Sequence, residues 1–357
     1  MIIVIILGIV CIYFAYLEGY KGKKNGLLIS FTLIFIFLAI RYDFGNDYLN
    51  YLTLFDSVNR LNDFMDIFQV QLYGEIGWII LCRLFRQLGF FTLIAFLAFF
   101  NCAVYYSFIK KYVVPKYYWL AVFIYIFNSS FLLVHSTAMR QSVAISIFII
   151  AIQFALKNRV LLFVLLVILA SFFHSSAIIL LPIYLVVNWE WKFNFVEVSA
   201  IILSFIILIF SMEYLPHFIN NIVGKYFTIY YRHLELSGVE IKSGLGIIFE
   251  MFLFLFLLIY SKFQHREITP IVKIYLISFY FIPLSMLSSM LSRSGMYFTP
   301  AAIVVFPMSF YLVKDVGIRR IIMSAFILYI LYTFYVFYNS AVWKDSFQVY
   351  KTIFSLL

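Results

Sequence analysis

Short polar motifs with arginines and carboxylates interrupt an otherwise apolar chain. One of them, from Arg41 to Tyr48, reads RYDFGNDY and is followed by Tyr51. A planar guanidinium can hold a phosphate through two parallel hydrogen bonds, and a carboxylate such as Asp43 or Asp47 can take a proton from a hydroxyl. This motif could therefore provide a general base and a contact to phosphate or sugar. The structural alternative is a polar loop whose aspartates cap a helix.

Three further motifs place ionisable groups beside apolar stretches. Glu75 precedes the run IGWIIL, Arg140 and Gln141 lie near the start of an apolar helix, and His174 precedes two serines. An arginine within an apolar span costs roughly 2.5 kcal/mol or more, so Arg140 is expected to serve a function. The structural alternatives are an N-terminal helix carboxylate for Glu75, snorkelling to the interface for Arg140 and a hydrogen-bonded cap for His174.

Another arginine, Arg293, lies in the run LSRSGMYF between two apolar stretches, with Tyr297 one helical turn further on. Taken alone, it would be an ordinary interfacial arginine. Two aromatic runs, residues 226–233 and 343–354, are most simply interfacial segments. The sequence contains no HExxH, CxxC, Walker or GxSxG motif. It therefore gives no support for a zinc protease, a nucleotide-driven pump or a serine hydrolase, and predicts neither a metal nor a cofactor.

The composition indicates that membrane-spanning helices position these motifs. Hydrophobic residues make up 65% of the 357 residues and charged residues only 12%, which is too little polar surface for a soluble globule. We therefore predict an all-α polytopic integral membrane protein. The lysines behind the net charge of +10 lie at helix ends. This placement fits an anionic lipid surface or an anionic lipid-linked substrate better than nucleic acid.

The apolar windows predict about twelve transmembrane helices and one doubtful segment, residues 75–88. A single membrane domain of residues 1–357 is the simplest organisation, with outer loops at 41–74 and 213–244. No cleaved targeting segment is expected, because the first apolar window is followed at once by a second. The windows are 1–17, 26–40, 75–88, 91–109, 117–134, 138–156, 160–173, 175–188, 196–212, 245–261, 270–291, 296–313 and 318–338.

Lysine-rich connections orient the predicted helices. If crossings alternate from Lys110 onward, these connections share one side, which the positive-inside rule assigns to the cytoplasm. For residues 21–24 and 110–116 to share that side, 75–88 cannot be an ordinary span. We therefore predict a re-entrant or interfacial helix there, on the outer side; a true span with some misplaced lysines is the alternative. Both termini then lie outside the cytoplasm.

The outer side receives most of the candidate groups. Residues 138–156 and 160–173 form a predicted helical hairpin with a polar turn between them, so His174 returns to the face that carries Arg140. Arginines outnumber lysines on this side, whereas lysines dominate the cytoplasmic side. Because arginine is favoured where a planar fork must grip a phosphate, the outer face has the character of an oxyanion-handling surface.

Together these motifs resemble those of the EpsG/Wzy family of bacterial exopolysaccharide, capsule and O-antigen polymerases. The resemblance covers nearly the whole chain, and MRQ with HSSA is its most specific part. Asn46 replaces the small hydroxyl residue that usually precedes the second aspartate, which weakens a chemical role at that position. The matching pieces are RxDxGxDYxxY from Arg41, ExG from Glu75, MRQxxA from Met139, HSSA from His174, RxGxYF from Arg293 and YKTIF from Tyr350.

The resemblance implies a glycosyltransferase at the outer face of the bacterial cytoplasmic (inner) membrane. Such polymerases transfer a growing glycan from undecaprenyl diphosphate to a hydroxyl of the next lipid-linked repeat unit. The implied partners are the lipid-linked donor and acceptor, membrane lipid and a chain-length regulator, and a GT-C-like helical arrangement is a candidate fold. The expected diphosphate-binding residues are Arg140, Arg293 and Arg41; the candidate bases are Asp47, Asp43, Glu75 and His174; further substrate contacts are Gln141, Tyr297 and Tyr51.

Other functions stay open on the residues alone. An O-antigen ligase or a sugar transferase that uses a polyprenyl phosphate donor would need the same arginines. A flippase or lipid transporter would favour cations in both halves of the membrane together with inverted repeats. Most charges here gather at the outer lip, which favours catalysis. A structural scaffold is less economical, because it leaves Arg140 without a role.

Overall fold

The computed structural model describes residues 1–60, 75–191, 194–211, 214, 245–261, 269–284 and 289–356. Almost all of its elements are helices, so the predicted all-α class is confirmed. The chain divides into two compact units, Met1–Ile178 with Met323–Leu357, and Ile179–Ile322. Of the two predicted outer loops, residues 61–74 and, except for Tyr214, residues 213–244 lie outside the described residues.

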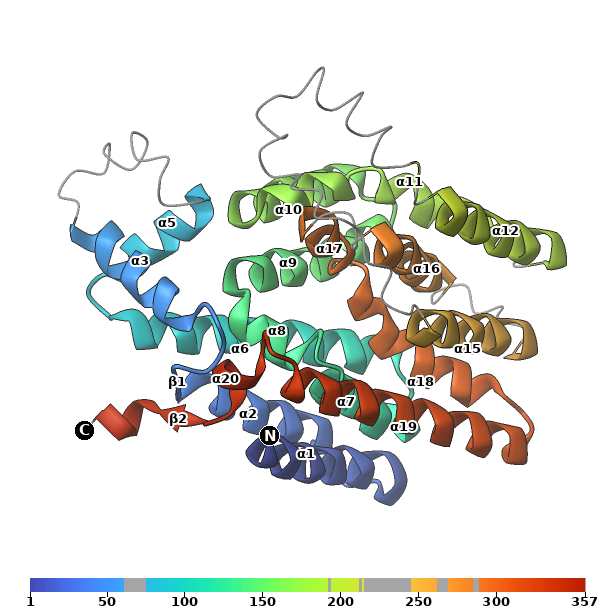
Figure 1. Cartoon of the computed structure of the whole chain (residues 1–357), viewed down its shortest axis with the longest axis horizontal. Helices are drawn as coiled ribbons and strands as arrows, with labels where there is room; N and C mark the ends of the chain where they lie inside the picture. Colours follow the sequence, from blue (N-terminus) through green and yellow to red (C-terminus); the bar gives the residue numbers. More distant parts are fainter. Residues whose placement is uncertain are drawn as a thin grey trace. The chain divides into compact units, whose positions relative to one another are not determined.

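The first unit is a group of packed helices, most of them apolar (Figure 1). They are α1 (Ile2–Lys21), α2 (Gly26–Ala39), α3 (Tyr48–Arg60), α5 (Ile76–Leu84), α6 (Phe90–Tyr112), α7 (Tyr118–Phe127), α8 (Leu132–Thr137), α9 (Met139–Ala155), α10 (Val160–Phe173) and α20 (Lys344–Phe347), with most of α19 (Val316–Asn339). α2 packs against α1 and α6, and α9 packs against α6 and α10. The short α5 contacts α3 and α10. The end of α2 and the starts of α5 and α9, where several of the predicted site residues lie, therefore belong to the same unit.

In the second unit, one helix is central. Its helices are α11 (Ile183–Asn188), α12 (Phe195–Ser211), α15 (Leu245–Ser261), α16 (Thr269–Leu284), α17 (Ser289–Gly295) and α18 (Ala302–Leu312). α16 packs against all five of the others. Lys273 on α16 is buried, and its ammonium donates to the carbonyls of Val186 and Val187, at 3.3 Å each, and of Trp189. A cation at the carboxyl end of α11 complements the helix dipole.

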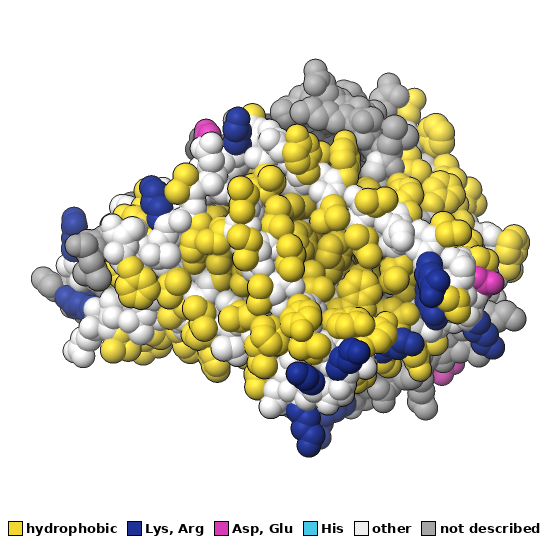
Figure 2. Space-filling model, turned by 90° about the horizontal axis from the view of Figure 1, so that it is seen from below, with side chains coloured by type: hydrophobic (Ala, Val, Ile, Leu, Met, Phe, Trp, Pro, Cys, Tyr) yellow, Lys and Arg dark blue, Asp and Glu magenta, His cyan; other side chains and the backbone are white. Residues whose placement is uncertain are grey.

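Four described helical stretches are long and apolar enough to cross a membrane, namely α1, residues 293–312, α6 and α19. α6, with 23 residues, extends about 35 Å, against a hydrocarbon thickness of about 30 Å. Seven shorter apolar stretches accompany them. Hydrophobic side chains cover most of the surface seen in Figure 2, and lysines and arginines gather toward its edges. The chain is thus a membrane protein, while the number of twelve spans and a GT-C-like arrangement stay predictions.

Two predicted apolar windows are shorter or more broken in the structure than in the sequence. The window 75–88 contains only the nine-residue helix α5, which covers about 14 Å and is too short to cross the membrane. The window 117–134 is divided into α7 and the start of α8 by residues 128–131. Asn128 contributes to this break, because its side chain accepts a hydrogen bond from the Ser130 backbone N–H at 3.0 Å and so competes with the helix.

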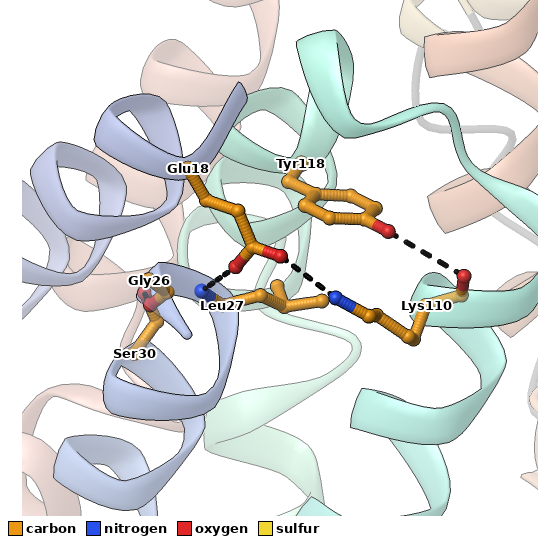
Figure 3. Close-up of polar contacts among 6 residues, drawn as sticks. All are labelled: Glu18, Gly26, Leu27, Ser30, Lys110 and Tyr118. Carbon is orange, nitrogen blue, oxygen red and sulfur yellow. Dashed lines mark hydrogen bonds and ion pairs between the residues drawn. The ribbon is translucent and has the colours of Figure 1, made fainter. Parts of the chain in front are cut away.

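Several lysine-rich connections of the first unit meet at one end of its helices. Glu18, near the end of α1, accepts hydrogen bonds from the Leu27 backbone N–H and from the Lys110 ammonium, both at 2.7 Å (Figure 3). Lys116 lies 5.8 Å from the centre of the Tyr20 ring, and Lys111 donates to Gln153 at 3.1 Å. The connections that follow α1 and α6 therefore lie at the same end of the helix group as the end of α9. This arrangement agrees with the prediction that these connections share one side of the membrane.

Candidate functional site

The opposite end of α9 carries a partly exposed ion pair. Arg140 lies in the first turn of α9, and its guanidinium donates to the carboxylate of Glu75. The exposed fractions of the two side chains are 29% and 21%. Glu75 is the N-cap of α5, yet its carboxylate makes no capping hydrogen bond, so the structure gives it a different partner from the one its position alone suggests. Along α9, Arg140 is about 20 Å from Gln153 at the lysine end.

Aromatic rings line one side of this ion pair. The Arg140 guanidinium lies 5.7 Å from the centre of the Tyr51 ring, and Tyr51 packs on Trp78 with ring centres 4.9 Å apart. Burial raises the pKa of Tyr51, although the nearby Arg140 acts in the opposite direction, so the hydroxyl stays protonated at neutral pH. Both rings are buried, so they support the guanidinium from the protein side through a cation–π contact with Tyr51.

A close backbone approach sets α5 against the end of α10. A Cβ atom added at Gly77 would lie 2.8 Å from the backbone oxygen of Phe172, closer than a real side chain allows. Glu75 and His174 are each two residues from this contact, so the same packing holds both near it. His174 ends α10, and its Nδ1 lies 2.7 Å from Ser176 Oγ.

The residues that follow α2 form a loop fixed at several points. This exit loop, residues 41–47, begins with the strand β1 (Arg41–Tyr42), which pairs with β2 (Lys351–Thr352) in an antiparallel ladder. Gly45 has φ 112°, and a Cβ atom there would lie 2.6 Å from Thr137 Oγ1. Glycine is therefore required both by its backbone conformation and by the space available. The loop packs against the residues that immediately precede α9.

Arg41 is buried at the start of this loop, with an exposed fraction of 4%. Its guanidinium donates to the Leu38 carbonyl at 2.8 Å and to the Ser136 carbonyl at 3.3 Å. Burial lowers the pKa of Arg41 to about 10, which leaves it protonated at neutral pH. Within the described ranges, no carboxylate forms an ion pair with it. Arg41 therefore brings an uncompensated positive charge to the junction between α2 and α8.

The two aspartates of the exit loop have different surroundings. Asp43 forms an ion pair with Lys351 at 3.2 Å. Asp47 is half-buried and precedes α3, where its backbone oxygen accepts a hydrogen bond from the Tyr51 N–H at 2.9 Å. This backbone contact places Asp47 one helical turn before Tyr51, at the start of α3.

The remaining predicted residues belong to the buried part of α9 or to the second unit. Gln141 is 3% exposed and belongs to the buried part of α9. Arg293 is exposed and Tyr297 is buried, and both belong to the second unit. The first unit thus gathers Arg140, Glu75 and Tyr51, with Asp47, the exit loop and His174 held by neighbouring elements.

Sequence reasoning missed two partners of the site. Lys351, the partner of Asp43, lies in a segment interpreted as an interfacial tail, and Trp78, which packs on Tyr51, is inside an apolar run. The YKTIF motif was visible in the sequence, but pairing across about 300 residues was not. In the part of the chain that the structure describes, no group of three His, Cys, Asp or Glu side chains could hold a metal ion.

The fold and this site define an all-α membrane protein with a cationic and carboxylate cluster at one end of a helix group. The model of the EpsG family matches residues 24–352, and the chain belongs to this family. Membership supports a role in polysaccharide synthesis of the polymerase type, with glycosyltransferase-like chemistry. No curated protein and no solved structure matches the chain.

Proposed function

We propose that the protein is a polysaccharide polymerase that uses undecaprenyl-diphosphate-linked glycans at the outer face of the cytoplasmic membrane. The observation that carries this proposal is the ion pair of Arg140 and Glu75 beside Tyr51, at the end of α9 opposite the lysine-rich connections. With the lysines in the cytoplasm, this cluster faces outward. A diphosphate leaving group and an acceptor hydroxyl need a cation and a base, respectively, and the cluster contains both.

In the proposed reaction, Arg140 holds the diphosphate of the donor. A guanidinium has five N–H donors, and the Arg140 side chain keeps an exposed fraction of 29%, so donors beyond the one that contacts Glu75 remain for phosphate oxygens. Neutralising the departing diphosphate lowers the barrier without a metal. Arg293 is a second proposed contact, and Arg41 supports the electrostatics from its buried position.

Glu75 is the proposed general base. A diphosphate oxygen that binds Arg140 competes with Glu75 for the same guanidinium, which makes the carboxylate available to the acceptor. The acceptor oxygen then attacks the anomeric carbon, the bond from that carbon to the diphosphate oxygen breaks, and the hydroxyl proton goes to Glu75. Undecaprenyl diphosphate leaves with the electron pair. Asp47, Asp43 and His174 are the alternative bases; Asp47 lies one helical turn before Tyr51, whereas Asp43 is paired with Lys351.

Incubation of the purified protein with a lipid-linked repeat unit tests the proposal. We expect a ladder of glycans on undecaprenyl diphosphate. Arg140→Ala and Arg293→Ala should abolish long polymer while leaving membrane insertion intact. Arg159→Ala is the matched control, because Arg159 is exposed at the lysine end of α9. A near-normal ladder from both site variants would contradict the proposal. Cells that carry a site variant and accumulate polymer on the lipid, instead of a single repeat unit, would indicate a ligase.

A further inference from the structure

We propose that residues 340–356, here called the return segment, are a positioning element for the exit loop, and that Tyr350 is their principal positioning residue. The proposal rests on the proposed function, because the exit loop carries Asp43 and Asp47 and adjoins α9. Both parts belong to the first unit. Three sets of contacts join the return segment to the exit loop and to the end of α2, from which the loop starts.

The first set satisfies the carbonyls at the end of α2. The last four carbonyls of a helix have no partner within the helix. Here the Tyr350 hydroxyl donates to the Phe37 carbonyl at 2.5 Å, and the Arg41 guanidinium donates to the Leu38 carbonyl. The Ile353 backbone N–H donates to the Ile40 carbonyl, just beyond the helix, at 2.9 Å. The return segment therefore completes the helix end from which the exit loop starts.

The second set consists of aromatic rings. Tyr350 stacks on Phe37 with ring centres 4.3 Å apart and an angle of 11° between the planes. Phe44, inside the exit loop, meets Phe347 edge-on at 4.9 Å, and both of these side chains are fully buried. Such ring pairs contribute about 0.5–1.5 kcal/mol each beyond the area they bury.

The third set holds the backbone of the loop. Arg41 and Tyr42 pair with Thr352 and Lys351 in the β1–β2 ladder. Further along, the Gly45 N–H donates to the Ser346 carbonyl at 3.1 Å, and the Asn46 amide donates to the Val342 carbonyl at 3.3 Å. The Lys351–Asp43 ion pair is substantially exposed, so it adds only about 0–1 kcal/mol. Ring stacking and backbone pairing therefore contribute most to fixing the exit loop. Tyr350 takes part in both the first and the second set.

Kinetics of Tyr350 variants test this role. In Tyr350→Ala, which removes the stack and the hydrogen bond, we expect kcat for polymerisation to fall about tenfold. Tyr350→Phe keeps the stack, so the fall should be about threefold. KM should stay within twofold for both, because Arg140 holds the donor. Tyr335→Phe is the matched control, since Tyr335 is exposed on α19. A normal kcat in Tyr350→Ala, or a change confined to KM or to the amount of folded protein, would overturn the proposal.

A cross-link provides a readout that does not depend on activity. Tyr42 and Lys351 face each other in the ladder, so Tyr42→Cys combined with Lys351→Cys should form a disulfide under mild oxidation. Tyr42→Cys with Lys344→Cys is the control pair. The cross-linked protein should keep the polymerase activity of its own reduced form, because a positioning element does not need to move.

Failure to cross-link, or inhibition that a reductant reverses, would contradict fixed positioning. Wild-type protein that makes no polymer would contradict the proposed function instead, and the cross-link would still report on the segment. Polymer from the wild type together with unaffected Tyr350 variants would contradict the inference alone.

Discussion

The Arg140 guanidinium is ion-paired with the Glu75 carboxylate, although 65 residues separate them in the sequence. A cation in the first turn of α9 opposes the helix dipole, and Glu75 compensates for this without capping its own helix. The pair therefore holds a guanidinium and a carboxylate together in a partly exposed place. A purely structural pair and a catalytic pair differ in what their substitution does.

Arg140→Lys separates charge from geometry. Lysine preserves the ion pair with Glu75 but lacks the planar fork that binds two phosphate oxygens. We expect the variant to reach the membrane in normal amounts and to polymerise at least tenfold more slowly, measured as polymer formed per folded molecule. Arg159→Lys is the control at the lysine end. Full activity of Arg140→Lys would show that a point charge is sufficient and that no bidentate contact is made.

Exchanging the two charges tests whether the pair is more than structural. The double variant Glu75→Arg with Arg140→Glu retains an ion pair, so it should fold better than either single exchange. Its polymerase activity should nevertheless fall by about 100-fold or more, because the proposed base and the proposed diphosphate contact have changed places. Membrane content and ladder formation are measured on the same preparations. Restored activity in the double variant would mean that the pair only supports the fold.

The sequence predicted the class of the fold and most of the residues in this cluster. Arg140 stood out because a cation in an apolar stretch is costly, and residues 75–88 stood out because the lysine-rich connections before and after them were predicted to share the cytoplasmic side. The first conclusion depends on local composition, and the second on how lysines are distributed along the chain. The nine-residue length of α5 agrees with the predicted re-entrant or interfacial helix.

The pairings could not be predicted, because they depend on tertiary contacts. Glu75 had several arginines as candidate partners, and Asp43 was not connected with Lys351, about 300 residues away. Arg41 was expected to bind substrate from an outer lip, whereas in the structure it is buried and bonded to two backbone carbonyls. How deeply a polar side chain is buried depends on the residues that surround it in space, and a single sequence does not show these.

Gly45→Ala should disturb the exit loop and lower activity more than Gly89→Ala does. Both Gly45 and Gly89 have positive φ, at 112° and 86°, so alanine is strained at either position. Only at Gly45 would the new Cβ meet another segment, 2.6 Å from Thr137 Oγ1, whereas Gly89 has open space. Gly45→Ala should therefore lower polymerisation per folded molecule several-fold, and Gly89→Ala should leave it within twofold. Equal effects would show that backbone strain alone matters.

Glu18 stabilises the lysine end without taking part in the reaction. Its carboxylate accepts from the first turn of α2 and from Lys110, and its side chain is 12% exposed (Figure 3). Glu18→Ala removes both contacts and should cost about 1–2 kcal/mol, seen as a lower melting temperature in detergent. Lys110→Met should cost less, because Lys110 is nearly half exposed. The kcat of the folded fraction should stay unchanged; a lower kcat would link this end to catalysis.

Cysteine labelling tests which end of the first unit faces outward. Asn46 is exposed in the exit loop, and Lys24 and Lys157 are exposed at the lysine end. In intact cells, a membrane-impermeant maleimide should label Asn46→Cys but not Lys24→Cys or Lys157→Cys. All three should react after permeabilisation, which controls for accessibility. The native residues Cys11, Cys82 and Cys102 are buried, so their background reaction should be low.

The labelling result bears directly on the substrate. Lipid-linked repeat units can reach Arg140 from the outer leaflet only if the exit loop faces that leaflet. Labelling of Lys24→Cys and Lys157→Cys in intact cells, with Asn46→Cys protected, would place the ion pair at the cytoplasmic side. That outcome would keep the geometry of the cluster but exclude polymerisation at the outer face, and the positive-inside assignment of the lysine-rich connections would be wrong.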